Sequence, residues 1–397
     1  MDSLRAIAAL LVLFGHAAFM AGALGEAGAV NELAARLDVG VAVFFLISGF
    51  LLYRPFVRAR LTGTPPPSAG AYAWRRFLRI VPAYWVALTV IALTFSLGYV
   101  ATADGILTYY GFGQIYRTGT VTGGIGQAWT LCIEVTFYAL LPLWALAMRR
   151  LRGGHRTELL AVGALFVVSV VWKVVVIGGE DPVVSGPALF ALPAFLDHFA
   201  LGMGLAILSA AWQDREGEPP ALVRVVDRRP WLPWAFAALA YLAAAYAIGL
   251  AGAFPEPMTP AQYLAKHELY ALVGLGLLLP AIFGDPRRGL VRRLLGTRVL
   301  LWLGLISYGV YLWHQAVLAK LYDWGLPQTH FAHPYLVWPA LGLAGAVLVA
   351  AVSYYAVERP LLSFKRLVPG RVPRGEAVAE PAPAVPPRPA EPVGVGD

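Results

Sequence analysis

Residues 1–24 read MDSLRAIAALLVLFGHAAFMAGAL, an apolar segment that carries one Arg, Arg5, and one His, His16. About 20 apolar residues cross the hydrocarbon core of a bilayer as a helix. The spacing of Arg5 and His16 is close to a whole number of helical turns, so both project from one face, about 16 Å apart along the axis. His16 then lies near mid-membrane and Arg5 at the rim. An ionisable residue at that depth marks a functional site by default.

The composition of the whole chain extends this interpretation. Of its 397 residues, 59% are hydrophobic and 14% are charged, and the mean hydropathy is +0.65. Soluble domains carry about 25% charged residues, so the chain is predicted to be an all-α polytopic membrane protein. Its net charge of +8 does not indicate nucleic acid as a partner, because the basic residues fall between apolar segments. A single cysteine, Cys132, excludes an internal disulfide and a cysteine-based metal cluster; no metal is expected.

About ten segments have the length of a membrane-spanning helix, and lipid-exposed backbone must satisfy its own hydrogen bonds, which favours helices. Clusters of Lys and Arg occupy alternate connections, beginning before the first segment and ending after the last. This alternation predicts that both termini are cytoplasmic, in a multi-pass protein of the plasma (inner) membrane. The predicted spans are 6–24, 37–53, 80–98, 128–147, 158–177, 190–211, 231–250, 265–284, 299–320 and 335–357.

Two regions outside the spans differ in composition. Residues 99–127 are rich in Gly and Tyr and are predicted to form an outer loop or a mobile lid. Residues 368–397 are rich in Pro, Ala, Glu and Val, which predicts a disordered cytoplasmic tail after one transmembrane domain, residues 1–367. A secretory signal peptide is the alternative interpretation of residues 1–24, but export requires neither His16 nor its whole-turn spacing from Arg5.

Three arginines stand at the predicted cytoplasmic entrance of the third span, Arg75, Arg76 and Arg79 in RRFLR. Two of them share a helix face and the third flanks it. Guanidinium groups bind phosphate in a bidentate manner, so this motif is a candidate phosphate site. The alternative is a positive-inside anchor that touches lipid head groups.

Two buried ionisable residues are candidates for catalysis. His16 is either a packing residue or a general base, a task that suits a neutral buried imidazole. Glu134 is a lone carboxylate in the fourth span and should be protonated or paired, with His16 across the bundle as its candidate partner. The alternative for Glu134 is a structural ion pair or a proton-coupling site.

Polar residues in later spans supply further candidates. Ser307, Tyr311 and His314 lie at i, i+4 and i+7, one face of the ninth span, and form either an acceptor site or an interfacial aromatic belt. The clusters Lys266-His267-Glu268 and Asp197-His198 could line an acceptor site, but a structural role is favoured. Glu358-Arg359-Pro360 is interpreted as a helix end with an ion pair at the cytoplasmic face.

The chain resembles membrane acyltransferase family 3, the family of O-antigen and exopolysaccharide O-acetylases. The motifs that carry the resemblance are MDSLRAIAALLVLFGH, VGVAVFFLISGFLL, RRFLRIVPAYW, WTLCIEVTFYALLPL, and ISYGVYLWH with VERPLL. The resemblance implies that Arg5 and His16 are the functional Arg and the catalytic His, and that Arg75, Arg76 and Arg79 bind acyl-CoA. It also implies that Glu134 is the acidic residue of the motif W-S-L-x-x-E-x-x-F-Y, in which Thr130 replaces the Ser.

The resemblance and the depth of these residues predict an integral membrane O-acyltransferase. Acyl-CoA, with acetyl-CoA as the default, would bind through its phosphates, and Arg5 would clamp it. Glu134 would orient His16, which deprotonates an acceptor hydroxyl or carries the acyl group itself. The acceptor would be a cell-envelope glycan, a glycolipid or a secondary metabolite, and the candidate residues for binding it are Trp129, Ser307, Tyr311 and His314.

A proton-coupled secondary transporter is the alternative function, with His16 and Glu134 as the relay. A transporter requires no phosphate-binding arginines and consumes no acyl-CoA. Turnover of acyl-CoA therefore distinguishes the two functions.

Overall fold

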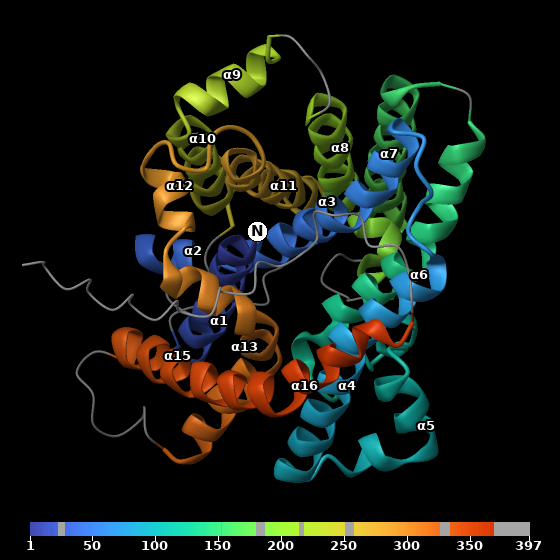
Figure 1. The fold of residues 1–397 in the computed structure, drawn as a ribbon. Coiled ribbons are helices and arrows are strands. Elements are labelled where there is room, and N and C mark those ends of the chain that lie inside the picture. Colours follow the sequence, from blue (N-terminus) through green and yellow to red (C-terminus); the bar gives the residue numbers. More distant parts are fainter. Residues whose placement is uncertain are drawn as a thin grey trace, which may run out of the picture.

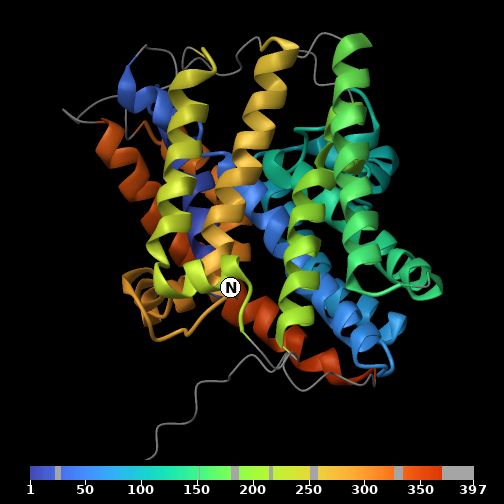
Figure 2. The same ribbon diagram turned by 90° about the horizontal axis from the view of Figure 1, so that it is seen from above.

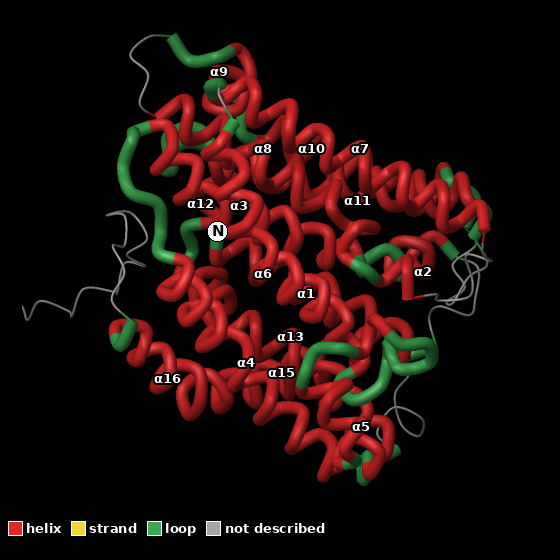
Figure 3. Tube along the Cα trace, turned by 90° about the vertical axis from the view of Figure 1, so that its right-hand side faces the viewer, coloured by secondary structure: helices red, strands yellow, loops and turns green. Residues whose placement is uncertain are grey.

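The computed structural model describes residues 1–22, 28–151, 153–179, 187–213, 218–250, 258–325 and 334–368. These residues form a bundle of helices (Figure 1), and Figure 3 shows no strand among them. The predicted all-α fold is thereby confirmed. The predicted disordered tail lies outside the described residues, apart from residue 368.

Each predicted span coincides with a helix. Eight helical stretches of the described ranges are long and apolar enough to cross a membrane, which makes this a multi-pass membrane protein. The other two predicted spans fall on α13 and on α10, which the π-turn η8 (Ala243–Ala247) extends. The long helices are α1 (Asp2–Met20), α3 (Val39–Leu61), α4 (Ala69–Thr94), α6 (Trp129–Arg150), α7 (His155–Gly179), α8 (Leu196–Gln213), α10 (Trp231–Leu242), α11 (Pro260–Ile282), α13 (Arg298–Asp323) and α15 (Pro334–Ser353).

Shorter helices connect or extend these spans. A π-turn, η9 (Tyr354–Glu358), joins α15 to α16 without a break in the helical path. A 3-10 helix, η7 (Leu192–Phe195), leads directly into α8. The remaining short α-helices are α2 (Ala29–Ala34), α5 (Ala103–Gly105), α9 (Ala221–Arg228), α12 (Leu290–Leu295) and α16 (Arg359–Ser363).

The first helix packs at the centre of one group of spans. It contacts α13, α15 and α3, while α3 in turn packs along α8. Figure 2 shows α7, α8, α10 and α11, coloured green to gold, running side by side, with α3 in blue inclined behind them. Because lipid is as apolar as leucine, such helices associate through close van der Waals packing, which small residues allow.

The crossing of α3 and α8 depends on glycine. A Cβ atom at Gly202 of α8 would lie 2.1 Å from the carbonyl oxygen of Leu46, and one at Gly49 of α3 would lie 2.3 Å from that of Phe199. Neither position has room for a side chain. Reciprocal glycines therefore set the distance between these two helices.

The segment between α4 and α6 is more ordered than the predicted loop. Residues 98–128 contain α5 and the short helices η2 (Gly98–Ala101), η3 (Ile106–Tyr110), η4 (Gln114–Tyr116) and η5 (Gly126–Ala128). The Tyr84 hydroxyl of α4 donates to the carbonyl of Tyr109 at 2.9 Å, and Ile115 is fully buried. The interpretation as a plain loop was wrong, because the segment contains short helices and packs on α4 and α6.

Candidate active site

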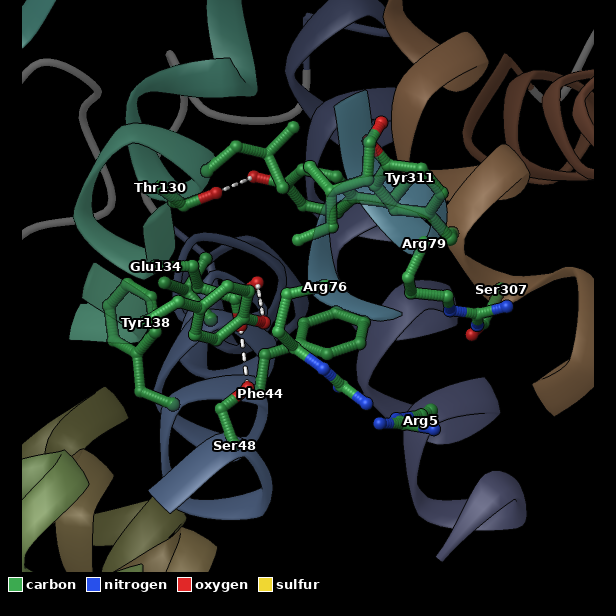
Figure 4. A pocket seen from close by; sticks show the side chains of 15 residues that line it. Arg5, Phe44, Ser48, Arg76, Arg79, Thr130, Glu134, Tyr138, Ser307 and Tyr311 are labelled. Atoms are coloured by element: carbon green, nitrogen blue, oxygen red, sulfur yellow. Dashed lines mark hydrogen bonds between the residues drawn. The ribbon is translucent and has the colours of Figure 1, made fainter. Parts of the chain in front are cut away.

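A cavity of about 80 Å³ lies between five helices that are far apart in the sequence, α1, α3, α4, α6 and α13 (Figure 4). Three arginines, one carboxylate and several hydroxyl groups line it, together with apolar side chains. We call it the arginine cavity. Its lining residues are Arg5, Val41, Phe44, Phe45, Ser48, Arg76, Arg79, Ile80, Thr130, Leu131, Glu134, Tyr138, Ser307, Tyr308 and Tyr311.

Arg5 enters the arginine cavity from the first turn of α1. A close approach to α13 places it there, since a Cβ atom at Gly304 would lie 2.1 Å from the carbonyl oxygen of Asp2. The Ser3 hydroxyl also donates to the carbonyl of Leu295. Asp2 lies 3.3 Å from the Arg5 guanidinium and balances part of its charge. Arg5 is therefore a cavity residue, as its place at the mouth of the first span suggested.

The arginines of RRFLR lie on a helix. The Ser68 hydroxyl accepts a hydrogen bond from the backbone N–H of Ala71 and caps α4, which begins at Ala69. The third span thus begins earlier than the predicted residue 80, and the three arginines occupy its second and third turns. Arg76 and Arg79 face the arginine cavity, whereas Arg75 does not line it. The three arginines, which the sequence analysis treated as one phosphate site, therefore lie on different faces of α4.

Arg76 and Arg79 differ in their partners. Arg79 Nη1 lies 3.6 Å from Glu358 Oε2, and Glu358 is 1% exposed. Glu358 was expected to take part in an ion pair at the helix end; its cationic partner is Arg79 of α4, while Arg359 lies over the ring of Tyr355. Among the described carboxylates, none forms an ion pair with Arg76, and its buried Nε has no hydrogen-bond partner. Figure 4 shows the guanidinium groups of Arg76 and Arg5 pointing toward one another.

The carboxylate of Glu134 is held by two hydroxyl groups. Oε1 accepts from Ser48 Oγ at 2.7 Å, and Oε2 accepts from the Tyr138 hydroxyl at 2.9 Å. Tyr138 is one helical turn further along α6, so this contact is local, while Ser48 reaches across from α3. The predicted pairing of Glu134 with His16 was wrong. Glu134 instead shares the arginine cavity with three cations.

His16 pairs with a second histidine. His314 Nε2 lies 3.2 Å from His16 Nδ1, and the two ring centroids are 5.0 Å apart. His314 Nδ1 lies 2.8 Å from the carbonyl oxygen of Tyr311, and His16 Nδ1 lies 2.9 Å from that of Val12. Carbonyl oxygens only accept hydrogen bonds, so both Nδ1 atoms carry a hydrogen. In the neutral pair, His16 Nδ1–H faces His314 Nε2, and His16 Nε2 retains a free lone pair.

The histidine pair adjoins the arginine cavity through Tyr311. The rings of Tyr311 and His314 are 5.9 Å apart, and Tyr311 lines the cavity although neither histidine does. The Tyr311 hydroxyl donates to the carbonyl of Gln127 at 2.8 Å and lies 2.6 Å from Thr130 Oγ1. The predicted helix face of Ser307, Tyr311 and His314 thus lies at this site, and all three side chains are buried rather than in an exposed aromatic belt.

Trp129 does not join this group. Its ring packs against those of Phe190 and Phe195, with centroids 5.1 and 5.6 Å apart, and it does not line the arginine cavity. The structure places Trp129 in the packing between α6 and the segment before α8. Its predicted acceptor-binding role therefore has no support from its position.

Two clusters that the sequence analysis treated separately form one buried network. Lys173 of α7 donates to Asp197 and, at 2.9 Å, to Glu268 of α11. His198 Nδ1 lies 2.9 Å from Asp197 Oδ1. Asp197, His198 and His267 also offer ligand atoms within 4.8 Å of one another, close enough for a metal ion. Both oxygens of Asp197 are already engaged, by Lys173 and by His198, so the geometry favours the structural role expected for these residues.

Sequence reasoning missed several residues of the site. Ser48 is a hydroxyl in the apolar run VFFLISGFLL, and Tyr138 follows Glu134 at i+4. Both were visible as polar groups within predicted spans, but nothing in one sequence indicates that they share a carboxylate. Gln127, which contacts Tyr311, lies just before the fourth span and had been assigned to the outer loop.

The fold and this site define a multi-pass membrane protein with an arginine-lined cavity beside a buried histidine pair. The family model Acyl_transf_3, described as an acyltransferase domain, matches residues 1–358. The chain therefore belongs to this family of membrane acyltransferases, as its motifs suggested. Membership disfavours the transporter alternative, and the expected His16–Glu134 relay is not formed.

Several curated proteins are similar over most of the chain. Nodulation protein 10 of Rhizobium leguminosarum bv. viciae is 26% identical over 387 residues, 92% of this chain and 93% of its own length. The exopolysaccharide production protein ExoZ of Rhizobium meliloti is 27% identical over 336 residues, 81% of this chain and 89% of its own length. The peptidoglycan O-acetyltransferase OatA of Listeria monocytogenes is 24% identical over 378 residues, 91% of this chain but 55% of its own length. No solved structure matches this chain significantly.

Proposed function

We propose that this protein is a plasma-membrane O-acyltransferase that uses cytoplasmic acyl-CoA, with acetyl-CoA as the default donor. Its acceptor is a hydroxyl of a cell-envelope glycan, a glycolipid or a secondary metabolite. The observation that carries the proposal is that Arg76, which forms no ion pair with a described carboxylate, lies in a cavity that Arg5 and Arg79 also line, next to the His16–His314 pair. Two relatives, a peptidoglycan O-acetyltransferase and an exopolysaccharide production protein, are consistent with such acceptors.

The arginine cavity suits the reactive end of the donor. Its volume of about 80 Å³ is several times the roughly 10–15 Å³ that one water molecule requires. That space accommodates an acyl thioester, while the nucleotide of acyl-CoA remains outside. Arg76 and Arg79 stand near the start of α4, at the end of the bundle predicted to be cytoplasmic, and are positioned to bind its phosphates. Arg75, on the adjacent face of α4, would contribute only its long-range charge.

His16 is the proposed base. Its Nε2 carries the free lone pair, and His314 accepts the hydrogen of His16 Nδ1. We propose that His16 Nε2 takes the proton of the acceptor hydroxyl while the hydroxyl oxygen bonds to the thioester carbonyl carbon. The C–S bond then breaks, and the imidazolium returns the proton to the thiolate, which leaves as free CoA. His314 thereby orients the His16 ring, as the third member of a catalytic triad orients its histidine. The sequence analysis had expected Glu134 to have this role.

Glu134 takes a different part in this proposal. It lies in the same cavity as Arg5, Arg76 and Arg79 and offers one negative charge to them. Ser48 and Tyr138 fix its carboxylate. We propose that Glu134 positions the arginines before the donor binds.

The test is the release of CoA from radiolabelled acetyl-CoA by the purified protein in nanodiscs, with a cell-envelope extract supplied as the source of acceptor hydroxyl groups. We expect wild type to release CoA and His16→Ala to lose at least 100-fold in rate, because a general base contributes about 10²–10⁴-fold. His155→Ala is the matched control, since His155 begins α7 and does not line the arginine cavity. No release by wild type, or equal release by wild type and His16→Ala, would contradict the proposal.

The same preparation separates direct transfer from a covalent relay. In a relay, His16 Nε2 attacks the thioester itself and carries the acyl group until the acceptor arrives. A single turnover without acceptor would then leave label on wild-type protein and none on His16→Ala. Direct transfer leaves both proteins unlabelled.

A further inference from the structure

A second cavity, of about 210 Å³, lies on the other side of the contact between Gln127 and Tyr311. Gln127 lines this second cavity, Tyr311 lines the arginine cavity, and the Tyr311 hydroxyl donates to the carbonyl of Gln127 at 2.8 Å. The two cavities therefore share a wall. We call the second one the glutamine cavity, because Gln127 and Gln315 are its polar lining residues.

We propose that the glutamine cavity is the acceptor subsite, and that it takes an amphiphilic glycoside with a sugar hydroxyl at Gln127 and its hydrocarbon along the apolar wall. This inference rests on the proposed function and narrows its acceptor to the glycolipid class. The hydroxyl at Gln127 would anchor the sugar next to the shared wall, and a neighbouring hydroxyl of the same sugar would be the one that is acylated.

The first support is an unsatisfied buried oxygen. Gln127 is 3% exposed, and its Nε2 donates to the carbonyl oxygens of Tyr311 and Leu312 at 2.8 and 2.9 Å. Both amide hydrogens are thus used, which fixes which end of the carboxamide is the oxygen. Oε1 is buried and has no hydrogen-bond partner in the described part of the chain. A buried hydrogen-bond acceptor without a partner costs about 1–3 kcal/mol. The hydroxyl group of a sugar could donate the missing hydrogen bond.

The second support is the distance to the proposed base along hydrogen bonds. The carbonyl oxygen of Tyr311 accepts from Gln127 Nε2 and from His314 Nδ1, each at 2.8 Å. His314 in turn contacts His16. One carbonyl group therefore separates the Gln127 carboxamide from His314 Nδ1, so a sugar bound at Gln127 is linked through hydrogen bonds to the histidine pair.

The third support is the apolar remainder of the cavity. Ile91, Phe95, Ala316 and Ala319 form its wall, from α4, the turn that follows it, and the last turns of α13. A free polysaccharide offers hydroxyl groups on every side and would leave many of them unpaired against such a wall. An alkyl chain matches it. Lys320 Nζ lies 4.6 Å from the centroid of the Phe95 ring and adds a cation at this end of α13.

The test compares two acceptors that differ only in their apolar part. Octyl β-D-glucoside, kept below its critical micelle concentration, and methyl β-D-glucoside are each supplied with radiolabelled acetyl-CoA to the protein in nanodiscs. We expect kcat/KM for transfer to the octyl glycoside to exceed that for the methyl glycoside at least tenfold. Equal values, or a preference for the methyl glycoside, would overturn the inference.

Substitutions then test whether the preference for the octyl glycoside depends on the glutamine cavity. Ala319→Trp fills the glutamine cavity, and we expect it to lower transfer to the octyl glycoside at least tenfold while acetyl-CoA binding stays within twofold of wild type. Leu301→Trp, on the exposed face of the same helix, should match wild type. If Ala319→Trp does not fold, Ala316→Leu fills the same cavity with a smaller side chain. Unchanged transfer in the folded filled variant overturns the inference, whereas absence of CoA release from wild type overturns the proposed function itself.

Discussion

His314 Nε2 lies 3.2 Å from His16 Nδ1, although 298 residues separate them in the chain. Helix α1 packs against α13, and this contact alone brings the two imidazoles together. The carbonyl of Tyr311 sets the tautomer of His314, and the carbonyl of Val12 sets that of His16, whose Nδ1 also faces His314 Nε2. The reactive nitrogen of His16 is thus fixed by a carbonyl of its own helix, while α13 supplies the imidazole beside it.

This relationship predicts the effect of changing His314, which acts as a positioning residue. We expect His314→Phe to lower kcat about 100-fold or more, because His16 loses the imidazole that orients its ring and keeps only the carbonyl of Val12 as a partner for its Nδ1 hydrogen. KM for acetyl-CoA should stay within about twofold, since His314 does not line the arginine cavity. His314→Gln offers a carboxamide oxygen to His16 and should recover part of kcat. A parallel loss of kcat and of donor binding would indicate general misfolding instead.

The positions of the arginines of α4 predict that substituting them has unequal effects on KM for acetyl-CoA. Arg76→Gln should raise KM for acetyl-CoA at least tenfold, because a charge-assisted hydrogen bond contributes about 1.5–3 kcal/mol. Arg75→Gln is the matched control, because it removes an identical charge from the adjacent residue, which does not line the arginine cavity. We expect it to change KM less than threefold, as measured by steady-state CoA release. Equal effects of both substitutions would favour a diffuse basic anchor over a defined phosphate site.

The pair of Arg79 and Glu358 predicts an energetic coupling. Arg79→Gln leaves the buried Glu358 without its cation, and breaking a buried pair costs about 3–5 kcal/mol; the partial exposure of Arg79 reduces this figure. We expect the double variant Arg79→Gln/Glu358→Gln to be more stable than Arg79→Gln alone. Thermal unfolding of the four proteins in the same detergent measures the coupling. Additive losses would show that the 3.6 Å contact contributes nothing to stability.

Substitutions in the network around Lys173 are expected to lower the stability of the protein without removing a residue of the proposed active site. The side chains of Lys173 and Asp197 are both fully buried, so Asp197→Asn should lower stability by about 3–5 kcal/mol. Glu268→Gln removes the second anion, but that side chain is one-third exposed, and the loss should be smaller. Thermal unfolding ranks the two variants. A larger effect of Glu268→Gln would reverse the assigned importance of the two carboxylates.

The crossing of α3 and α8 predicts a sharp contrast between two glycines on one helix. Gly202→Ala would place a Cβ atom 2.1 Å from the carbonyl oxygen of Leu46, whereas a Cβ atom at Gly204 meets nothing within 4 Å. We expect Gly202→Ala to lower the thermal midpoint by several degrees, because the helices must separate. Gly204→Ala should be neutral or stabilising, since alanine is about 0.5–1 kcal/mol better than glycine within a helix. Equal midpoints would show that the helices accommodate the methyl group.

Much of the fold could be predicted from the sequence because the bilayer imposes a local rule. A segment of about 20 apolar residues has to satisfy its backbone within itself, so each span becomes a helix wherever it lies in the bundle. The same argument placed Arg5 and His16 on one helix and recognised Glu134 as an anomaly. Helix starts were less accurate: the cap at Ser68 lies within a polar stretch, and α4 begins before its apolar residues do.

The membrane fold, the family and most of the polar residues at the site can be read from the amino-acid sequence. Their partners follow from how the helices pack: His314 rather than Glu134 lies beside His16, Ser48 and Tyr138 bind Glu134, and Glu358 pairs with Arg79. Periodicity places a residue on a face of its own helix, but the pairing of faces depends on how the helices pack. Here glycines set that packing through contacts such as Gly304 with Asp2 and Gly202 with Leu46, which one sequence does not encode in any local pattern.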